Sequence, residues 1–191
     1  GTLFPYTTLF RSKESFHKAL RSMEIGSYGL ESRIFGNPAD YQKPLNEDQL
    51  ALICQKLQVP GWERVWYLAD AIRAGFSVDK IYQLSGIDPW FVSNLAQLIE
   101  MEGALLACKL PSNHEDTAFI DLLRQAKQYG FSDRRLATLL SSSESAVRQF
   151  RHAHDIRPVY KRVDTCGAEF EAYTPYFYST YETECEAEPT D

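Results

Sequence analysis

The side chains best able to do chemistry form a polar group in the second helix of an expected helix-turn-helix. Arg148, Gln149, Arg151 and His152 could contact DNA there. The matching helix of an earlier, similar segment, residues 89–103, carries no basic residue, and the net charge of the chain is −6. Because DNA affinity comes largely from neutralising phosphates, this balance argues against a dedicated nucleic-acid binder. Helix hairpins are also common packing units, so DNA binding is kept only as the alternative function.

Two histidines and an acidic run are the other candidates for chemistry. His152 and His154 are two residues apart, which points them away from each other on a helix and argues against a metal site. The carboxylates of residues 181–191, YETECEAEPTD, are expected to form a solvated acidic link and not an acid–base pair. A small basic group is more typical of a salt-bridging surface than of a phosphate site; it comprises Arg157, Lys161 and Arg162.

Motifs for nucleotide binding and covalent catalysis are missing from the sequence. It contains no G-x-x-x-x-G-K-[ST], no G-x-G-x-x-G and no G-x-S-x-G. We therefore expect no catalytic, cofactor-binding or metal-binding residue in this chain.

Composition indicates a globular, cytoplasmic protein. Hydrophobic residues make up 44% of the 191 residues, which is enough for a core. The four cysteines are far apart, with no CxxC pair, as is typical of reduced thiols; they are Cys54, Cys108, Cys166 and Cys185. No apolar run approaches the roughly 20 residues that a membrane span needs.

Apolar residues at helical spacing predict short amphipathic helices along most of the chain. The first covers residues 12–26, and Asn46 is expected to cap the next. A third begins near Trp62, which is expected to point inward. A long helix runs from Pro89 to about residue 107, with Phe91 on its apolar face.

An internal repeat organises the middle of the chain. Residues 74–95, AGFSVDKIYQLSGIDPWFVSNL, resemble residues 129–150, YGFSDRRLATLLSSSESAVRQF, at a constant offset of 55 residues. In each copy a glycine closes one helix and a serine caps the next. In the second copy, Ser141 and Glu144 could form a capping box, although Ser143 competes for that role. The sequence thus predicts an all-α helical bundle built from two helix-turn-helix hairpins.

The two ends of the chain depart from this pattern. Residues 2–12, TLFPYTTLFRS, resemble a translated sequencing-adapter oligonucleotide, so we expect residues 1–12 to be an accidental, dispensable addition to a gene fragment. From Ile156 onward, prolines and closely spaced aromatic residues predict an extended, irregular segment that crosses the helices. Alternating rings at Tyr176, Phe177 and Tyr178 should place aromatic surface on both sides of that segment.

The C-terminal block carries a family resemblance. Residues 158–186, PVYKRVDTCGAEFEAYTPYFYSTYETECE, are similar to the segment that precedes the second ATP-using half of carbamoyl-phosphate synthase large chains. RSMEIG, WYLADAIRAG, IDPWF and GFSDRRLA also resemble that family's sequences. The resemblance covers roughly residues 13–191, and Gly167 and Tyr173 depart from the family pattern.

The resemblance implies a segment between two ATP-dependent synthetase halves of one large chain. Residues 13–45 would hold the last helix of the first half and a linker, residues 46–155 the helical oligomerisation domain, and residues 156–191 an extended lead-in to the second half. ATP and Mg²⁺ (or Mn²⁺) would belong to the full-length protein. Its implied partners are the two halves, other large-chain copies and a small glutamine-hydrolysing subunit, without nucleic acid or membrane. The C-terminal block separates this interpretation from a stand-alone helix-turn-helix protein, which would not need it.

Overall fold

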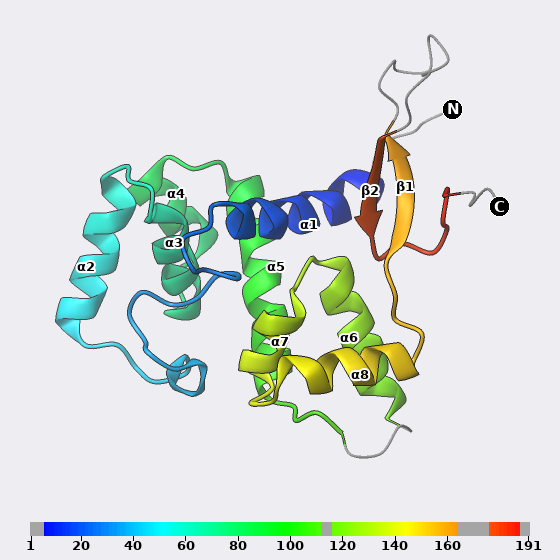
Figure 1. Ribbon diagram of the computed structural model, residues 1–191. Helices are drawn as coiled ribbons and strands as arrows, with labels where there is room; N and C mark the ends of the chain where they lie inside the picture. The colour runs from blue at the N-terminus through cyan, green and yellow to red at the C-terminus, as the bar shows by residue number, and fades with distance from the viewer. Residues whose placement is uncertain (1–5, 112–115, 164–175, 188–191) are drawn as a thin grey trace, which may run out of the picture.

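Helices dominate the computed structural model, which describes residues 6–111, 116–163 and 176–187, with side chains from residue 12 onward (Figure 1). The helices are α1 (Tyr6–Ser22), the 3-10 helix η1 (Pro38–Asp40), α2 (Glu47–Gln58), α3 (Arg64–Arg73), α4 (Val78–Ser85), α5 (Pro89–Leu106), α6 (Thr117–Gln128), α7 (Asp133–Leu139) and α8 (Glu144–Ala153). Two strands follow, β1 (Val159–Val163) and β2 (Tyr176–Thr180). The prediction of an all-α fold with a non-helical C-terminal segment is confirmed.

The extended C-terminal segment differs from the expectation in one respect. Its two described stretches pair with each other as an antiparallel hairpin, in which Val159 lies opposite Thr180 and Val163 opposite Tyr176. The pairing satisfies backbone groups that a single extended segment would leave to solvent. The sequence did not predict this pairing.

The two repeat copies fold alike at the glycine that ends their first helix. Gly75 and Gly130 both take the left-handed conformation, with φ of +79° and +87°. The next N–H in each copy, that of Phe76 or Phe131, donates to the carbonyl five residues earlier, at 3.0 and 3.1 Å respectively. This is the Schellman arrangement that glycine favours at a helix end. The repeat offset therefore marks a real structural duplication.

The helix starts of the two copies also correspond. Ser77 accepts a hydrogen bond from a backbone N–H of α4, and Ser132 does the same for α7. Asp88 caps α5, and Ser143, 55 residues later, caps α8. Of the two serines considered for this cap, Ser143 is therefore the one used, and Ser141 takes the left-handed conformation, with φ of +50°.

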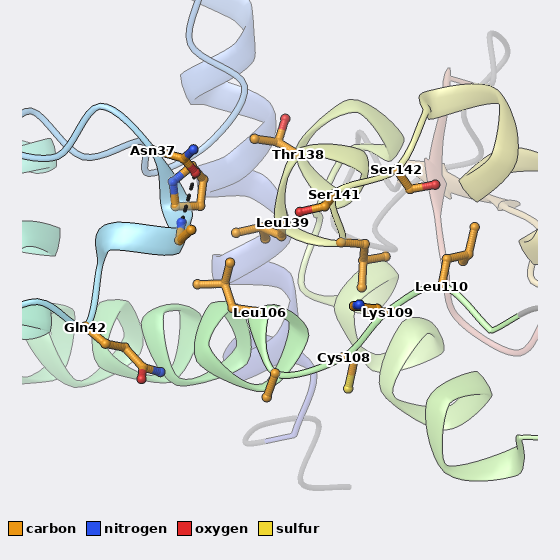
Figure 2. A pocket seen from close by; sticks show the side chains of 14 residues that line it. Asn37, Gln42, Leu106, Cys108, Lys109, Leu110, Thr138, Leu139, Ser141 and Ser142 are labelled. Atoms are coloured by element: carbon orange, nitrogen blue, oxygen red, sulfur yellow. Dashed lines mark hydrogen bonds between the residues drawn. The ribbon is translucent and has the colours of Figure 1, made fainter.

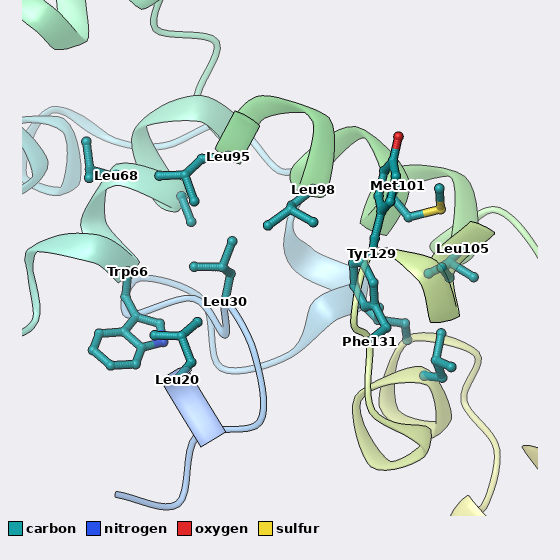
Figure 3. Packing of buried hydrophobic residues seen from close by; sticks show 14 of the residues in the cluster. Leu20, Leu30, Trp66, Leu68, Leu95, Leu98, Met101, Leu105, Tyr129 and Phe131 are labelled. Atoms are coloured by element: carbon teal, nitrogen blue, oxygen red, sulfur yellow. The ribbon is translucent and has the colours of Figure 1, made fainter. Parts of the chain in front are cut away.

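The core surrounds α5, the second helix of the first copy, which packs against α3, α4 and α7 (Figures 1 and 3). Apolar side chains from α3, α5 and the second copy meet there, including Trp66, Leu98, Leu105, Phe131 and Leu136. Two rings expected in the core are instead exposed. Trp62 lies before the start of α3, and Phe91 lies in the first turn of α5; their exposed fractions are 64% and 51%.

Helix α1 begins and ends earlier than the sequence predicted. It covers Tyr6–Ser22, whereas the predicted helix covered residues 12–26. The helix therefore starts within the segment that resembles adapter sequence. Its residues Lys13, His17 and Leu20 are buried, so α1 packs tightly on the rest of the chain.

Membrane insertion finds no support in the helices. Within the described residues, none is both long and apolar enough to cross a bilayer.

Candidate functional site

The basic group on α8 does not form a free DNA-contacting surface. Arg151 is buried, and its guanidinium donates to a carboxylate oxygen of Asp133 at 2.8 Å and to the carbonyl of Ile156 at 3.2 Å. Arg148 lies 2.6 Å from Glu144 in an exposed ion pair. These contacts engage both arginines within the protein, so the fold offers no support for the helix-turn-helix alternative.

The histidines and the C-terminal charges have structural contacts too. The ring of His154 packs on Phe150, with centroids 4.5 Å apart. Within the acidic stretch expected to be a solvated link, Glu186 is exposed to solvent but also forms an ion pair, 3.1 Å from Lys161. Hydrogen-bond donors lower the pKa of the Glu186 carboxyl, first the backbone N–H of Arg162 and then the ammonium of Lys161. Across the described residues, no group of three potential metal ligands comes together.

A buried charge network joins the two copies. Glu102 on α5 accepts from Arg73 of α3 at 2.5 Å and from Arg135 of α7 at 2.7 Å. Arg73 also donates to Asp70 at 3.0 Å, and the Arg73 guanidinium lies over the ring of Tyr41. Side chains of the two arginines, Asp70 and Glu102 are all at most 3% exposed. A carboxylate shared by two guanidiniums fixes three helices in one arrangement.

The charged groups of this network are buried and paired with one another, so they are not available to a substrate. Burial disfavours the charge of Arg135, but Glu102 and Tyr41 together outweigh burial and raise the pKa of the Arg135 guanidinium. The sequence analysis missed these residues. One signal existed: Glu102 lies four residues after Leu98 and three before Leu105, on the apolar face of a helix, where a charge requires a buried partner.

A second network lies in the second copy. Asp133 accepts from Lys127 at 2.8 Å and from Arg151 at 2.8 Å. Burial pushes the pKa of the Asp133 carboxyl upward, but these two cations outweigh burial and lower it. The ammonium of Lys127 also lies over the ring of Tyr181, 4.8 Å from its centroid, just beyond β2. The second copy thus touches the C-terminal segment through a charged residue of its own core.

Helix α1 closes tightly on the second copy. The imidazole Nδ1 of His17 donates to the carbonyl of Tyr129 at 2.9 Å, and Arg21 donates to the carbonyl of Gly130 at 2.7 Å. The His17 ring also stands edge-on to Phe131, with centroids 4.6 Å apart. A Cβ on Gly130 would lie only 2.7 Å from the Cα of Glu14. Gly130 therefore provides both a helix end and room for α1.

We expect stability to fall in mild acid because of His17. Burial lowers its pKa from 6.5 to about 4, so the unfolded chain binds a proton that the folded chain resists. The contribution is present above pH 6.5 and is lost as pH falls toward 4, a loss of about 3 kcal/mol. Urea unfolding at pH 7 and pH 4 should show a smaller loss in His17→Gln than in the unmodified chain. The exposed His152→Gln is the control, and a loss equal to that of the unmodified chain in both variants would contradict the assignment.

An open pocket lies where α5 ends, next to η1 and the turn after α7 (Figure 2). Its volume is about 720 Å³. Among the described residues that line it, Lys109 alone is charged, and polar side chains come from Gln42, Thr138, Ser141 and Ser142. Asn37 uses its side-chain oxygen to accept from Ala39 N–H at 3.0 Å (Figure 2). The lining lacks an acid–base pair, so the pocket assigns no reaction to the chain.

The hairpin exposes rings on both of its faces. Cross-strand neighbours place Tyr160 and Phe177 on one face and Val163 and Tyr176 on the other. All four side chains are exposed, Tyr176 most of all at 61%. The predicted two-sided aromatic surface is confirmed for Tyr176 and Phe177, whereas Tyr178 is half-buried. Gly167 and Tyr173 lie outside the described residues.

Comparisons of this chain with a family model and with curated proteins point to the same family. The family described as "Carbamoyl-phosphate synthetase large chain, oligomerisation domain" matches residues 11–155. The chain is 45% identical over 179 residues to the carbamoyl phosphate synthase large chain of Vibrio cholerae, which covers 94% of this chain and 15% of the relative. The same protein of Myxococcus xanthus is 47% identical over 178 residues, covering 93% and 15%. That of Rhodopirellula baltica is 48% identical over 175 residues, covering 91% and 15%.

The chain thus spans about 15% of the length of these curated relatives. The match begins in α1 and includes both repeat copies. It therefore also includes the buried ion pairs of Glu102 and Asp133. The chain belongs to the carbamoyl-phosphate synthetase large-chain family and corresponds to its oligomerisation domain.

Proposed function

We propose that this chain is a non-catalytic connecting and oligomerising segment of a complete carbamoyl-phosphate synthase large chain. The complete protein would make carbamoyl phosphate from bicarbonate, glutamine-derived ammonia and ATP, for arginine and pyrimidine biosynthesis. ATP and Mg²⁺ or Mn²⁺ would bind outside this segment, and the enzyme would work in the cytoplasm. Other large-chain copies and a small glutamine-hydrolysing subunit would be its partners.

The proposed organisation follows the chain. Residues 13–45 would continue from the first synthetase half, residues 46–155 would form the helical domain, and residues 156–191 would lead into the second half. The observation that carries the proposed function, though not these boundaries, is the family match over residues 11–155. The closed ion pairs of Glu102 and Asp133 support a structural role, because neither carboxylate is available to a substrate.

The purified chain should show no bicarbonate-dependent ATP hydrolysis, because its sequence holds no phosphate-binding loop. The measurement is ATP turnover with Mg²⁺ and bicarbonate, with the Vibrio cholerae large chain as the positive control.

Sedimentation velocity over a range of concentrations should show self-association. Turnover that depends on bicarbonate, or a strictly monomeric chain at all concentrations, would contradict the proposal.

A further inference from the structure

We propose that a contact between α1 and β2 fixes the strand hairpin on the helical domain and sets the direction in which the chain continues. This contact, which we call the joint, consists of Glu14, Lys18, Ser179 and Thr180. It brings together residues 166 positions apart, since the hydroxyl of Thr180 donates to a carboxylate oxygen of Glu14 at 2.8 Å. Lys18 donates to the carbonyl of Ser179, so side chain and backbone of β2 are both held.

Two of the four residues of the joint are buried, whereas most of the hairpin is exposed to solvent. Thr180 is 2% exposed and Glu14 is 7% exposed, whereas most of β2 faces solvent. The carboxylate of Glu14 also pairs with Lys18 at 2.8 Å. Removing the Thr180 hydroxyl would leave this buried carboxylate with one partner fewer, which is costly because the group is charged.

The hairpin depends on such a contact for its order. An isolated two-stranded hairpin is marginally stable in water, because few side chains are buried. Figure 1 shows the two strands beside α1, away from α2, α3 and α4. Tyr181 adds one further contact, to Lys127 of the second copy. The position of the hairpin therefore depends on a few contacts, of which the buried Thr180–Glu14 hydrogen bond is one.

Three parts of the fold meet at the joint: α1, the second copy and the hairpin. Glu14 contacts β2 through its side chain, while its backbone lies against Gly130 of the second copy. Arg21, seven residues later on α1, binds the Gly130 carbonyl. α1, the second copy and the hairpin thus meet as one rigid unit.

This inference rests on the proposed function for its consequence in the complete enzyme. There, α1 would continue from the first synthetase half and β2 would lead into the second. A rigid contact between them would set the relative orientation of the two halves. Glu14 and Thr180 are then positioning residues, which act on the reaction without touching a substrate.

The first test uses the chain itself and hydrogen exchange. Thr180→Val keeps the shape of the side chain but removes its hydroxyl, and we expect backbone amides of β2 to exchange about ten-fold faster. Amides of α5 should exchange at the unmodified rate. Ser179→Ala is the matched control, because it removes an exposed side-chain hydroxyl and keeps the backbone carbonyl through which Ser179 takes part in the joint. Unchanged exchange in β2, or equal acceleration in α5, would contradict the proposal that the joint holds β2 on the helical domain.

The second test measures coupling in a chimera of the Vibrio cholerae large chain that carries this segment in place of its own. We expect Thr180→Val to raise the ATP hydrolysed per carbamoyl phosphate formed by about two-fold or more, with bicarbonate-dependent ATP hydrolysis retained. Ser179→Ala should leave the ratio unchanged. An unchanged ratio in Thr180→Val, or a parallel loss of both activities, would overturn the positioning role. A correctly folded but inactive chimera would instead contradict the proposed function. The hydrogen-exchange result would then be the test of whether the joint holds β2 in place.

Discussion

Gly130→Ala should destabilise the chain by about 2–5 kcal/mol, more than Gly75→Ala. Both glycines have a positive φ, and a left-handed non-glycine residue costs roughly 1–2 kcal/mol. Gly130 has a second constraint, because its Cβ would lie 2.7 Å from the Cα of Glu14 and 3.1 Å from the Glu14 carbonyl oxygen. Backbone cannot rotate away as a side chain can, so α1 must shift, at an added cost of about 1–3 kcal/mol.

Gly75→Ala is the matched control, since it occupies the same position in the other repeat copy. A Cβ there meets nothing within 4 Å, so only the backbone term of about 1–2 kcal/mol should appear. Urea unfolding of both variants gives the comparison. Equal losses at the two positions would mean that α1 does not pack against Gly130 as described.

Glu102→Gln should cost about 3–5 kcal/mol in the free energy of unfolding. The substitution keeps the size of the side chain but removes the negative charge that Arg73 and Arg135 share. Both guanidiniums would stay buried, and the new amide would present N–H donors to groups that can only donate. Breaking one partner of a buried ion pair is costly because the remaining charge has no compensation.

Glu144→Gln is the control for charge removal as such. Its ion pair with Arg148 is about half exposed, so the change should alter the free energy of unfolding by less than about 0.5 kcal/mol. Urea unfolding at neutral pH measures both variants. Similar small losses in the two would show that the Glu102 network does not hold the helices together.

The repeat was predictable because its signals are local. Gly75 and Gly130 end helices through their own backbone conformation, and Ser77 and Ser132 cap helices within three residues. The same argument predicted the Asn46 cap, which the structure confirms. A pattern within a few residues is sufficient wherever the interaction itself spans only a few residues.

The networks and the joint could not be found this way. Glu102 and Arg135 are 33 residues apart, and Glu14 and Thr180 are 166 apart, so their pairing depends on how helices pack. Trp62 and Phe91 show the same limit of sequence patterns: the spacing predicts that both are buried, but both are exposed. Their spacing fits an apolar stripe, but each lies at a helix start and is more than half exposed.

The pairing of β1 with β2 also escaped prediction, for a related reason. Strong hairpin signals are short turns such as Asn-Gly between two alternating runs. Here residues 164–175 separate the strands, and they contain no such dipeptide. The alternation of Tyr176, Phe177 and Tyr178 indicated an extended segment but gave no information about its partner.

The central claim is that this segment serves as the oligomerisation domain of a carbamoyl-phosphate synthase large chain. Its most direct test is carbamoyl-phosphate synthesis by the Vibrio cholerae large chain in which this segment replaces the equivalent region, which is 45% identical. We expect the chimera to form carbamoyl phosphate from bicarbonate, ammonia and ATP, while the same large chain with that region deleted does not. A folded chimera with no more synthesis than the deletion would contradict the claim.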